Sequence, residues 1–187
     1  MDKTRDKTHD LSVPSGGSGV EGTLVDGALH GAALIYVDGL MLANLHYVRG
    51  RLSGPATLLY PDGTKSAQLN YADDKLHGKA VYYAQDGSVQ REANYANGVL
   101  HGDSRTYLPD GTLLEHTRYR QGKLHGLVER FHTNGQLAER RLYGAGKPVE
   151  AGERYAQDGR PLDADGKPMS RWRRWRQMMP GAEPAPQ

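Results

Sequence analysis

Glycine recurs along this chain at intervals of 24 residues, without a slip over six positions. Asp or Asn precedes the glycine each time, and such Asx-Gly pairs are typical of tight turns that need a positive φ. A fixed period of this length indicates a repeat array. The spacing therefore predicts six hairpin turns, with structural glycines at Gly39, Gly63, Gly87, Gly111, Gly135 and Gly159.

A second ladder of turn residues runs about half a unit out of phase with the first, so each unit carries two turns. Its members are Gly27, Gly50, Asp74, Gly98, Gly122 and Gly146. About a dozen residues between turns hold a strand of roughly 5 to 8 residues but no packed helix. The fold class is therefore predicted to be all-β, an elongated, twisted, antiparallel meander of about six hairpin repeats with about 11 or 12 strands.

Aromatic residues follow the same period. Leu, Val, Ile and Phe together supply 33 of 187 residues, about 18 per cent, which is too few for a deep core. A single-layer sheet needs no deep core, because ladders of neighbouring side chains stabilise it. The clearest such ladder is Tyr47, Tyr71, Tyr95, Tyr119 and Tyr143.

Charge and cysteine content exclude several classes of function. The 24 basic and 22 acidic side chains are interspersed, so the net charge of +2 does not indicate a nucleic-acid surface. The chain has no cysteine, which excludes disulfides, thiolate zinc sites and a cysteine nucleophile. No catalytic motif is found, so we expect no enzymatic activity, no catalytic residue and no cofactor.

The chain divides into three segments. Residues 1–20 are predicted to be a flexible polar segment, residues 21–168 the repeat array, and residues 169–187 a basic Trp/Arg tail. On a helix Trp172 and Trp175 would share a face, so the tail is predicted to form a short amphipathic capping helix followed by disorder. Without an apolar leader the sequence predicts a cytoplasmic protein. The alternative is a periplasmic protein, with or without a lipid anchor, whose leader has been removed.

Four histidines recur in the tripeptide Leu-His-Gly, at His30, His77, His101 and His125. Equivalent residues one unit apart lie two strands apart, roughly 9 to 10 Å at the spacing of β-strands. Two histidine nitrogens on one zinc ion lie only about 3 to 4 Å apart. We therefore predict no metal site, and expect each histidine to make a local hydrogen bond that shapes the turn.

Two stretches carry a resemblance to a known family. Residues 95–102 read YANGVLHG and are followed by YLPDG, and residues 119–126 read YRQGKLHG and are followed by FHTNG. These units resemble the bacterial variant of the MORN repeat, as found in YwqK-type antitoxins and related toxin-immunity proteins. The chain departs from the pattern at Asp74 in place of Gly, at Ser53 in place of His, and in the unit that begins at Gly146.

The resemblance implies an immunity protein or antitoxin, expected as a monomer, that binds and neutralises a cognate bacterial toxin or secreted effector. The alternative is a membrane-associated MORN-type scaffold, with the tail in contact with the bilayer. An accessory module of an enzyme would lack space for a catalytic domain. Because Tyr, Trp and Arg dominate protein interfaces, the predicted partner-binding residues are Tyr71, Tyr95, Tyr119, Arg118, Arg130, Trp172 and Trp175.

Overall fold

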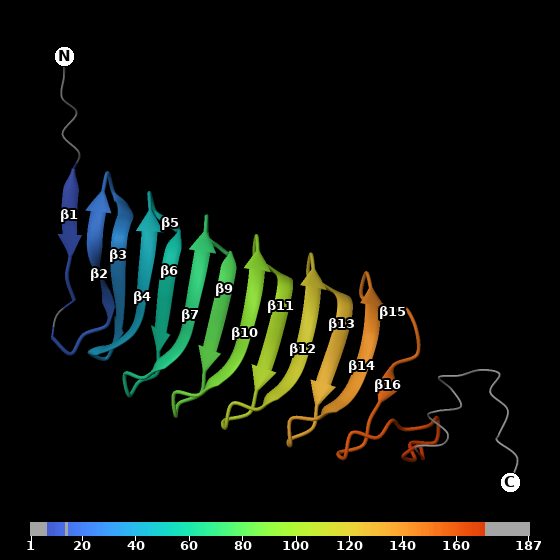
Figure 1. Ribbon diagram of the computed structural model, residues 1–187. Helices are drawn as coiled ribbons and strands as arrows, with labels where there is room; N and C mark the ends of the chain where they lie inside the picture. Colours follow the sequence, from blue (N-terminus) through green and yellow to red (C-terminus); the bar gives the residue numbers. More distant parts are fainter. Residues whose placement is uncertain (1–6, 14, 171–187) are drawn as a thin grey trace, which may run out of the picture.

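One antiparallel sheet makes up the fold in the computed structural model, which describes residues 7–13 and 15–170 (Figure 1). Along most of the sheet each long strand pairs with the long strands before and after it in the chain. The strands are β1 (Thr8–Leu11), β2 (Gly19–Val25), β3 (Ala28–Val37), β4 (Leu40–Val48), β5 (Arg51–Leu52), β6 (Gly54–Leu59), β7 (Lys65–Ala72), β8 (Lys75–Leu76), β9 (Gly78–Tyr83), β10 (Val89–Ala96), β11 (Val99–Tyr107), β12 (Leu113–Arg120), β13 (Lys123–Phe131), β14 (Leu137–Gly144), β15 (Lys147–Pro148) and β16 (Glu153–Arg154).

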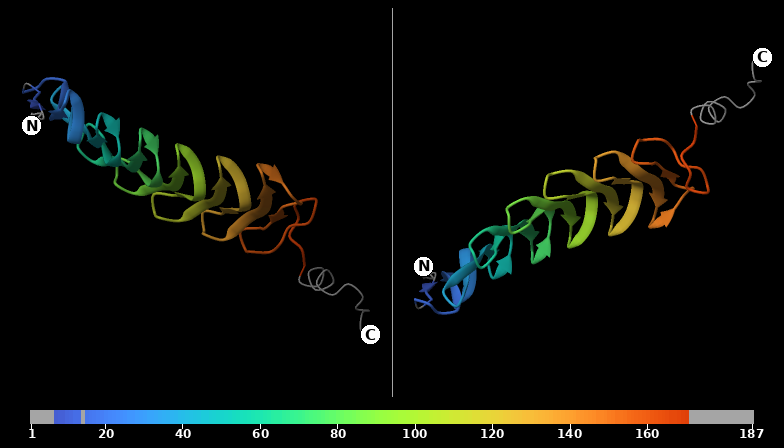
Figure 2. Two further views of the ribbon diagram at one scale, coloured as in Figure 1. Left: turned by 90° about the horizontal axis from the view of Figure 1, so that it is seen from above. Right: turned by 90° about the horizontal axis from the view of Figure 1, so that it is seen from below.

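This architecture confirms the predicted all-β antiparallel meander, and the described residues contain no helix. Figure 2 shows the hairpins following one another along a single long axis. The sheet has 16 strands rather than 11 or 12, in part because Ser53 and His77 interrupt what would be continuous strands. The sheet also includes β1 and the start of β2, which lie within the segment 1–20. The predicted capping helix lies outside the described residues.

Two-residue turns connect the strands at the ends that lie uppermost in Figure 1. This row of turns is here named the upper edge of the array. In the turn between β10 and β11, Asn97 and Gly98 have φ of 51° and 84°, the signature of a type I′ turn. Asp74 occupies the glycine position one unit earlier with φ of 66°. Its carboxylate accepts a 2.8 Å hydrogen bond from the N–H of Leu52, which accounts for an aspartate at a glycine position.

At the opposite, lower edge the Asx-Gly pairs from Gly63 onwards form a different turn, a three-residue loop, whereas Asp38 and Gly39 form a two-residue turn with φ of 50° and 77°. Between β6 and β7 the carbonyl of Tyr60 accepts from the N–H of Gly63 (2.9 Å), and the N–H of Tyr60 donates to Thr64 (2.8 Å). This is a type I turn followed by a bulge at a left-handed glycine. Only Gly63 needs a positive φ there, and the Asp62 carboxylate instead accepts from the N–H of Thr64 (2.9 Å).

Hydrogen bonds between turns join successive units along the upper edge. The N–H of Gly98 donates to the carbonyl of Leu76 in the preceding unit at 2.8 Å, and Gly122 donates to Leu100 at the same distance. Gly146 repeats the contact in the following turn. Each turn is therefore oriented by its predecessor, as nearest-neighbour stabilisation of a repeat array requires.

The core is a row of mostly small side chains that crosses the middle of the strands, the central row. It lies on one face of the sheet, here named the inner face. No large side chain is fully buried in the described residues, whereas Ala80 and Ala93 are 1% and 0% exposed. The buried members of the row are Ala33, Ala56, Leu69, Ala80, Ala93, Ser104, Thr117 and Val128.

Tyrosine rings cover the central row from both sides. Tyr71, Tyr82 and Tyr95 pack against the buried cluster that contains Leu69 and Ala80. Tyr82 and Tyr95 approach from opposite ends of the strands, and their hydroxyl oxygens lie 3.3 Å apart. Burial raises the pKa of the Tyr82 phenol above its usual value, and the neighbouring Tyr95 raises it further. The single sheet thus makes a shallow core from side chains of one face.

The lower-edge turns provide a test of the backbone assignment. Gly111 has φ of 86°, and a side chain added there would meet no atom within 4 Å, so any penalty comes from backbone strain alone. We expect Gly111→Val to lower the free energy of unfolding by about 1 to 3 kcal/mol, measured by denaturant titration. Gly111→Asn should be milder because Asn tolerates the left-handed region. Equal stabilities of the wild type and Gly111→Val would contradict the assignment.

Candidate recognition surface

The tyrosine ladder occupies the inner face at the base of the upper-edge hairpins. Tyr71 lies directly across from Leu76, and Tyr95 lies across from Leu100. The rings are half-buried. Desolvation by burial raises the pKa of Tyr71, and the neighbouring tyrosines raise it further. The pairs repeat along the sheet as Tyr47–Leu52, Tyr71–Leu76, Tyr95–Leu100 and Tyr119–Leu124. These rings stabilise the sheet and still present an edge to solvent.

The inner face changes from apolar to charged along the array. The change is clearest in the inner-face side chains that lie nearest the lower edge. In the N-terminal half this row contains Leu58, Ala67 and Tyr82, and Ala67 lies opposite both of the others. In the C-terminal half Arg130 lies between two acidic residues. Its Nε is 2.9 Å from Glu115, and its Nη1 is 3.2 Å from Glu139.

These two carboxylates raise the pKa of Arg130, the hydrogen bond to Glu115 being the larger cause. The arginine side chain nevertheless remains 55% exposed. It is therefore available to a partner while its position is set by neighbouring strands. The inner face thus carries apolar side chains at one end of the array and oriented charges at the other.

The opposite, outer face carries a separate cluster around His116. The Nε2 atom of His116 lies 3.0 Å from Asp103 on one side, and Nδ1 lies 3.2 Å from Glu129 on the other. Arg118 also contacts Asp103, at 3.3 Å. Hydrogen bonds from His116 and then Arg118 lower the pKa of Asp103. The cluster links β11, β12 and β13.

The structure divides the predicted partner-binding residues between the two faces. Tyr71, Tyr95, Tyr119 and Arg130 share the inner face with the central row. Arg118 lies on the outer face. The preceding residue, Thr117, is buried in the central row, and adjacent side chains of a strand point to opposite faces of the sheet. The two arginines therefore do not form one surface. Trp172 and Trp175 lie outside the described residues.

The recurring histidines do not play the expected local role. His30, His77, His101 and His125 are all exposed, and in the described part of the chain none makes a side-chain hydrogen bond. The backbone N–H of His77 donates to Asn70 instead, at 2.8 Å. Within residues 7–13 and 15–170 no group of three or more His, Cys, Asp or Glu side chains is arranged to hold a metal ion.

Sequence reasoning missed the cluster at His116 because its members come from three strands and share no motif. Strand alternation could have assigned Arg118 and His116 to one face, since they are two residues apart. Their acidic partners depend on the register of β11 and β13, which places Glu129 opposite His116 and Asp103 opposite Arg118.

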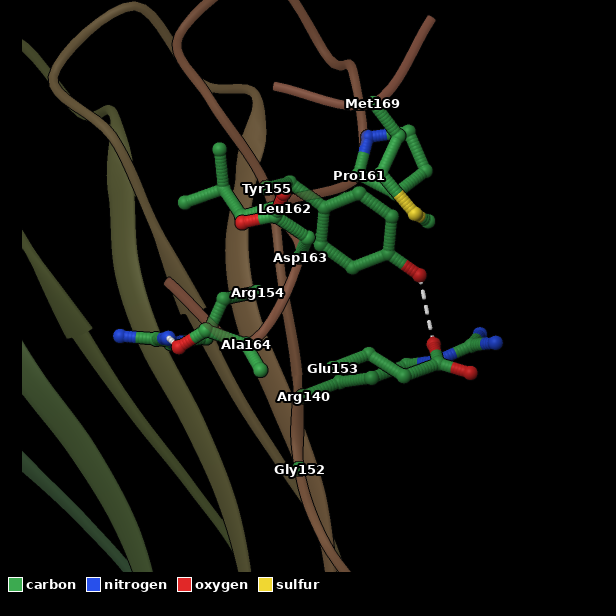
Figure 3. A pocket seen from close by; sticks show the side chains of 10 residues that line it. All are labelled: Arg140, Gly152, Glu153, Arg154, Tyr155, Pro161, Leu162, Asp163, Ala164 and Met169. Atoms are coloured by element: carbon green, nitrogen blue, oxygen red, sulfur yellow. Dashed lines mark hydrogen bonds and ion pairs between the residues drawn. The ribbon is translucent and has the colours of Figure 1, made fainter. Parts of the chain in front are cut away.

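A hollow of about 530 Å³ lies at the C-terminal end of the sheet (Figure 3). Tyr155, Pro161, Leu162 and Met169 give it apolar walls. Its charged groups are already engaged: Arg140 contacts Glu153 at 2.6 Å, Glu153 accepts from the Tyr155 hydroxyl, and Arg154 donates to a backbone carbonyl.

Comparison with known proteins identifies the repeats. Residues 76–97 and 124–144 match the MORN repeat variant, and residues 46–65 match the MORN repeat. The array is thus built at least in part of MORN-type repeats, as the resemblance implied. No curated protein matches the chain.

A solved structure with a similar region is a crystal structure of a GtfA/B complex bound to UDP and GlcNAc. The likeness covers 78% of this chain and 28% of that chain, with 16% sequence identity and a TM-score of 0.31. This chain thus spans less than a third of the length of that one. A likeness at this TM-score adds nothing to the description of the fold.

The cluster on the outer face leads to a prediction on pH. The pKa of Asp103 is lowered in the folded state, so its stabilising effect is present above the unfolded value of about 4 and is lost as pH falls through the folded value. We expect Asp103→Asn to lower the thermal midpoint at pH 7 and to reduce its decline on acidification. The measurement is the thermal midpoint between pH 7 and pH 2.

The control for this prediction is Asp26→Asn, which changes an exposed aspartate with no side-chain ion pair among the described residues. Its acid profile should follow that of the wild type. Parallel profiles for the wild type and Asp103→Asn would show that the Asp103 cluster contributes nothing to pH-dependent stability.

Proposed function

We propose that this protein is a recognition scaffold that captures a folded protein partner on the inner face of its array. The supporting observation is that this face presents half-buried tyrosines and ordered charges with no second layer over them in the described residues. Tyr and Arg are enriched among residues that dominate binding energy. A sheet that exposes such side chains at a regular spacing is suited to bind an extended surface.

We propose further that the partner is a cognate bacterial toxin or secreted effector, and that the protein acts as its immunity protein. The MORN-variant repeats support this proposal through their resemblance to those of antitoxins. Neutralisation requires stoichiometric binding and no catalytic group, which is consistent with a surface whose polar side chains are mostly paired. The charged half of the face would contribute partner selection and association rate more than affinity.

The test uses two arginines that are matched in exposure and lie on opposite faces. Arg130 and Arg118 are 55% and 59% exposed, and each contacts acidic residues. Arg130→Glu should weaken capture of a toxin encoded beside this protein, because charge reversal at an interface disturbs both attraction and register. Arg118→Glu should leave capture unchanged. Binding is measured by calorimetry well below the thermal midpoint of each variant.

Three outcomes would contradict the proposal. If both reversals leave capture intact while removal of residues 171–187 abolishes it in a folded protein, the binding site lies in the tail. If Arg118→Glu alone weakens capture, the outer face binds. If the protein co-sediments with liposomes and captures no toxin, it is a membrane-associated scaffold. No helix among the described residues is long and apolar enough to span a bilayer.

A further inference from the structure

The upper-edge hairpin between β12 and β13 contains a pair of like charges. Arg120 and Lys123 lie directly opposite each other across the turn. Like charges in this position destabilise an antiparallel pair. The equivalent pairs in other units contain at most one charge, as in Ala72 opposite Lys75 and Ala96 opposite Val99.

Neither cation has an acidic partner among the described residues. Arg51, in an earlier upper-edge hairpin, contacts Asp73 at 3.7 Å. Arg120 and Lys123 make no ion pair and no side-chain hydrogen bond with any described residue. His125 adds a third nitrogen-bearing side chain, and alternation along β13 places it on the same side as Lys123.

These side chains surround a hollow of about 480 Å³. Arg120, Gln121, Lys123 and His125 line one part of it. Gly144 and Ala145, from the next upper-edge turn, line the rest. Gly144 has no side chain and Ala145 has only a methyl group, which leaves room for a ligand of several atoms between two neighbouring hairpins, β12–β13 and β14–β15 (Figure 1).

We propose that this hollow binds a phosphate group. An anion with two charges would offset the repulsion between Arg120 and Lys123, and a singly charged carboxylate would offset it less completely. The guanidinium of Arg120 can donate two parallel hydrogen bonds to phosphate oxygens, and the ammonium of Lys123 supplies a compact charge. The amide of Gln121 supplies a further donor. The unfavourable charge pair is thus explained as part of a binding site.

The experiment titrates inorganic phosphate into the full-length protein at constant ionic strength maintained with chloride. Binding is followed by the imidazole NMR signals of His125 and by the thermal midpoint. We expect phosphate to shift both, and chloride alone to shift neither. Lys123→Ala should weaken phosphate binding by about tenfold or more, since it removes a charge-assisted contact. Without phosphate, the same variant should melt no lower than the wild type.

The matched control is Lys75→Ala, at the equivalent position two units earlier, where the opposite residue is Ala72. It should bind phosphate as the wild type does. Equal losses in Lys75→Ala and Lys123→Ala would show diffuse screening and overturn the proposal. The same conclusion would follow if phosphate had no effect beyond that of chloride.

The phosphate group could belong to a soluble molecule or to a lipid, and a second arm distinguishes these sources. It uses phosphatidylcholine vesicles that contain phosphatidic acid. Vesicle binding that is lost in Lys123→Ala would support the site and assign the phosphate to a membrane. A phosphate-induced NMR shift without vesicle binding would support the site and assign the phosphate to a soluble ligand. Neither arm involves a toxin, so the proposed function is tested separately.

Discussion

The contact between tyrosine rings and the central row of small side chains is the interaction on which this fold depends. In the described residues no second layer packs against the sheet. Side chains of one face must therefore form the core and also shield it from solvent. Ala80 and Ala93 allow rings such as Tyr82 and Tyr95 to lie over the backbone, with their hydroxyl groups 3.3 Å apart. Larger residues at every position would hold the rings away from the sheet and expose apolar surface.

The two edges then propagate this unit along the chain. On the upper edge, turn amides such as that of Gly98 donate to a carbonyl of the preceding unit. On the lower edge, the Tyr60 hydroxyl donates to the carbonyl of Tyr83 in the following unit, at 2.9 Å. Side chains can therefore vary between units while the backbone repeats. The apolar-to-charged change on the inner face, and the cation pair of Arg120 and Lys123, are variations on this constant frame.

Much of the fold could be predicted from the sequence, because Gly, Asx and Tyr recur with a period that turn chemistry explains. Three features could not. The central row could not be recognised because its alanines carry no motif in the sequence. Only the register of the strands places them side by side. The lower-edge turns contain the Asx-Gly pairs of a two-residue turn, yet from Gly63 onwards three-residue loops form, such as the one in which Asp62 accepts a hydrogen bond from the N–H of Thr64. For the site, the tyrosine ladder was predicted, but the separation of Arg118 from Arg130 required strand alternation and pairing to be combined.

The most direct test of this account compares Ala80→Leu with Val81→Leu by denaturant unfolding. The two residues are adjacent in β9, Ala80 lying in the central row and Val81, half-buried, on the outer face. Overpacking beneath the tyrosine rings should make Ala80→Leu less stable than the wild type by about 1 to 3 kcal/mol. Val81→Leu should change stability by less than about 0.5 kcal/mol. Equal, small effects of the two substitutions would show that the rings do not close over the central row.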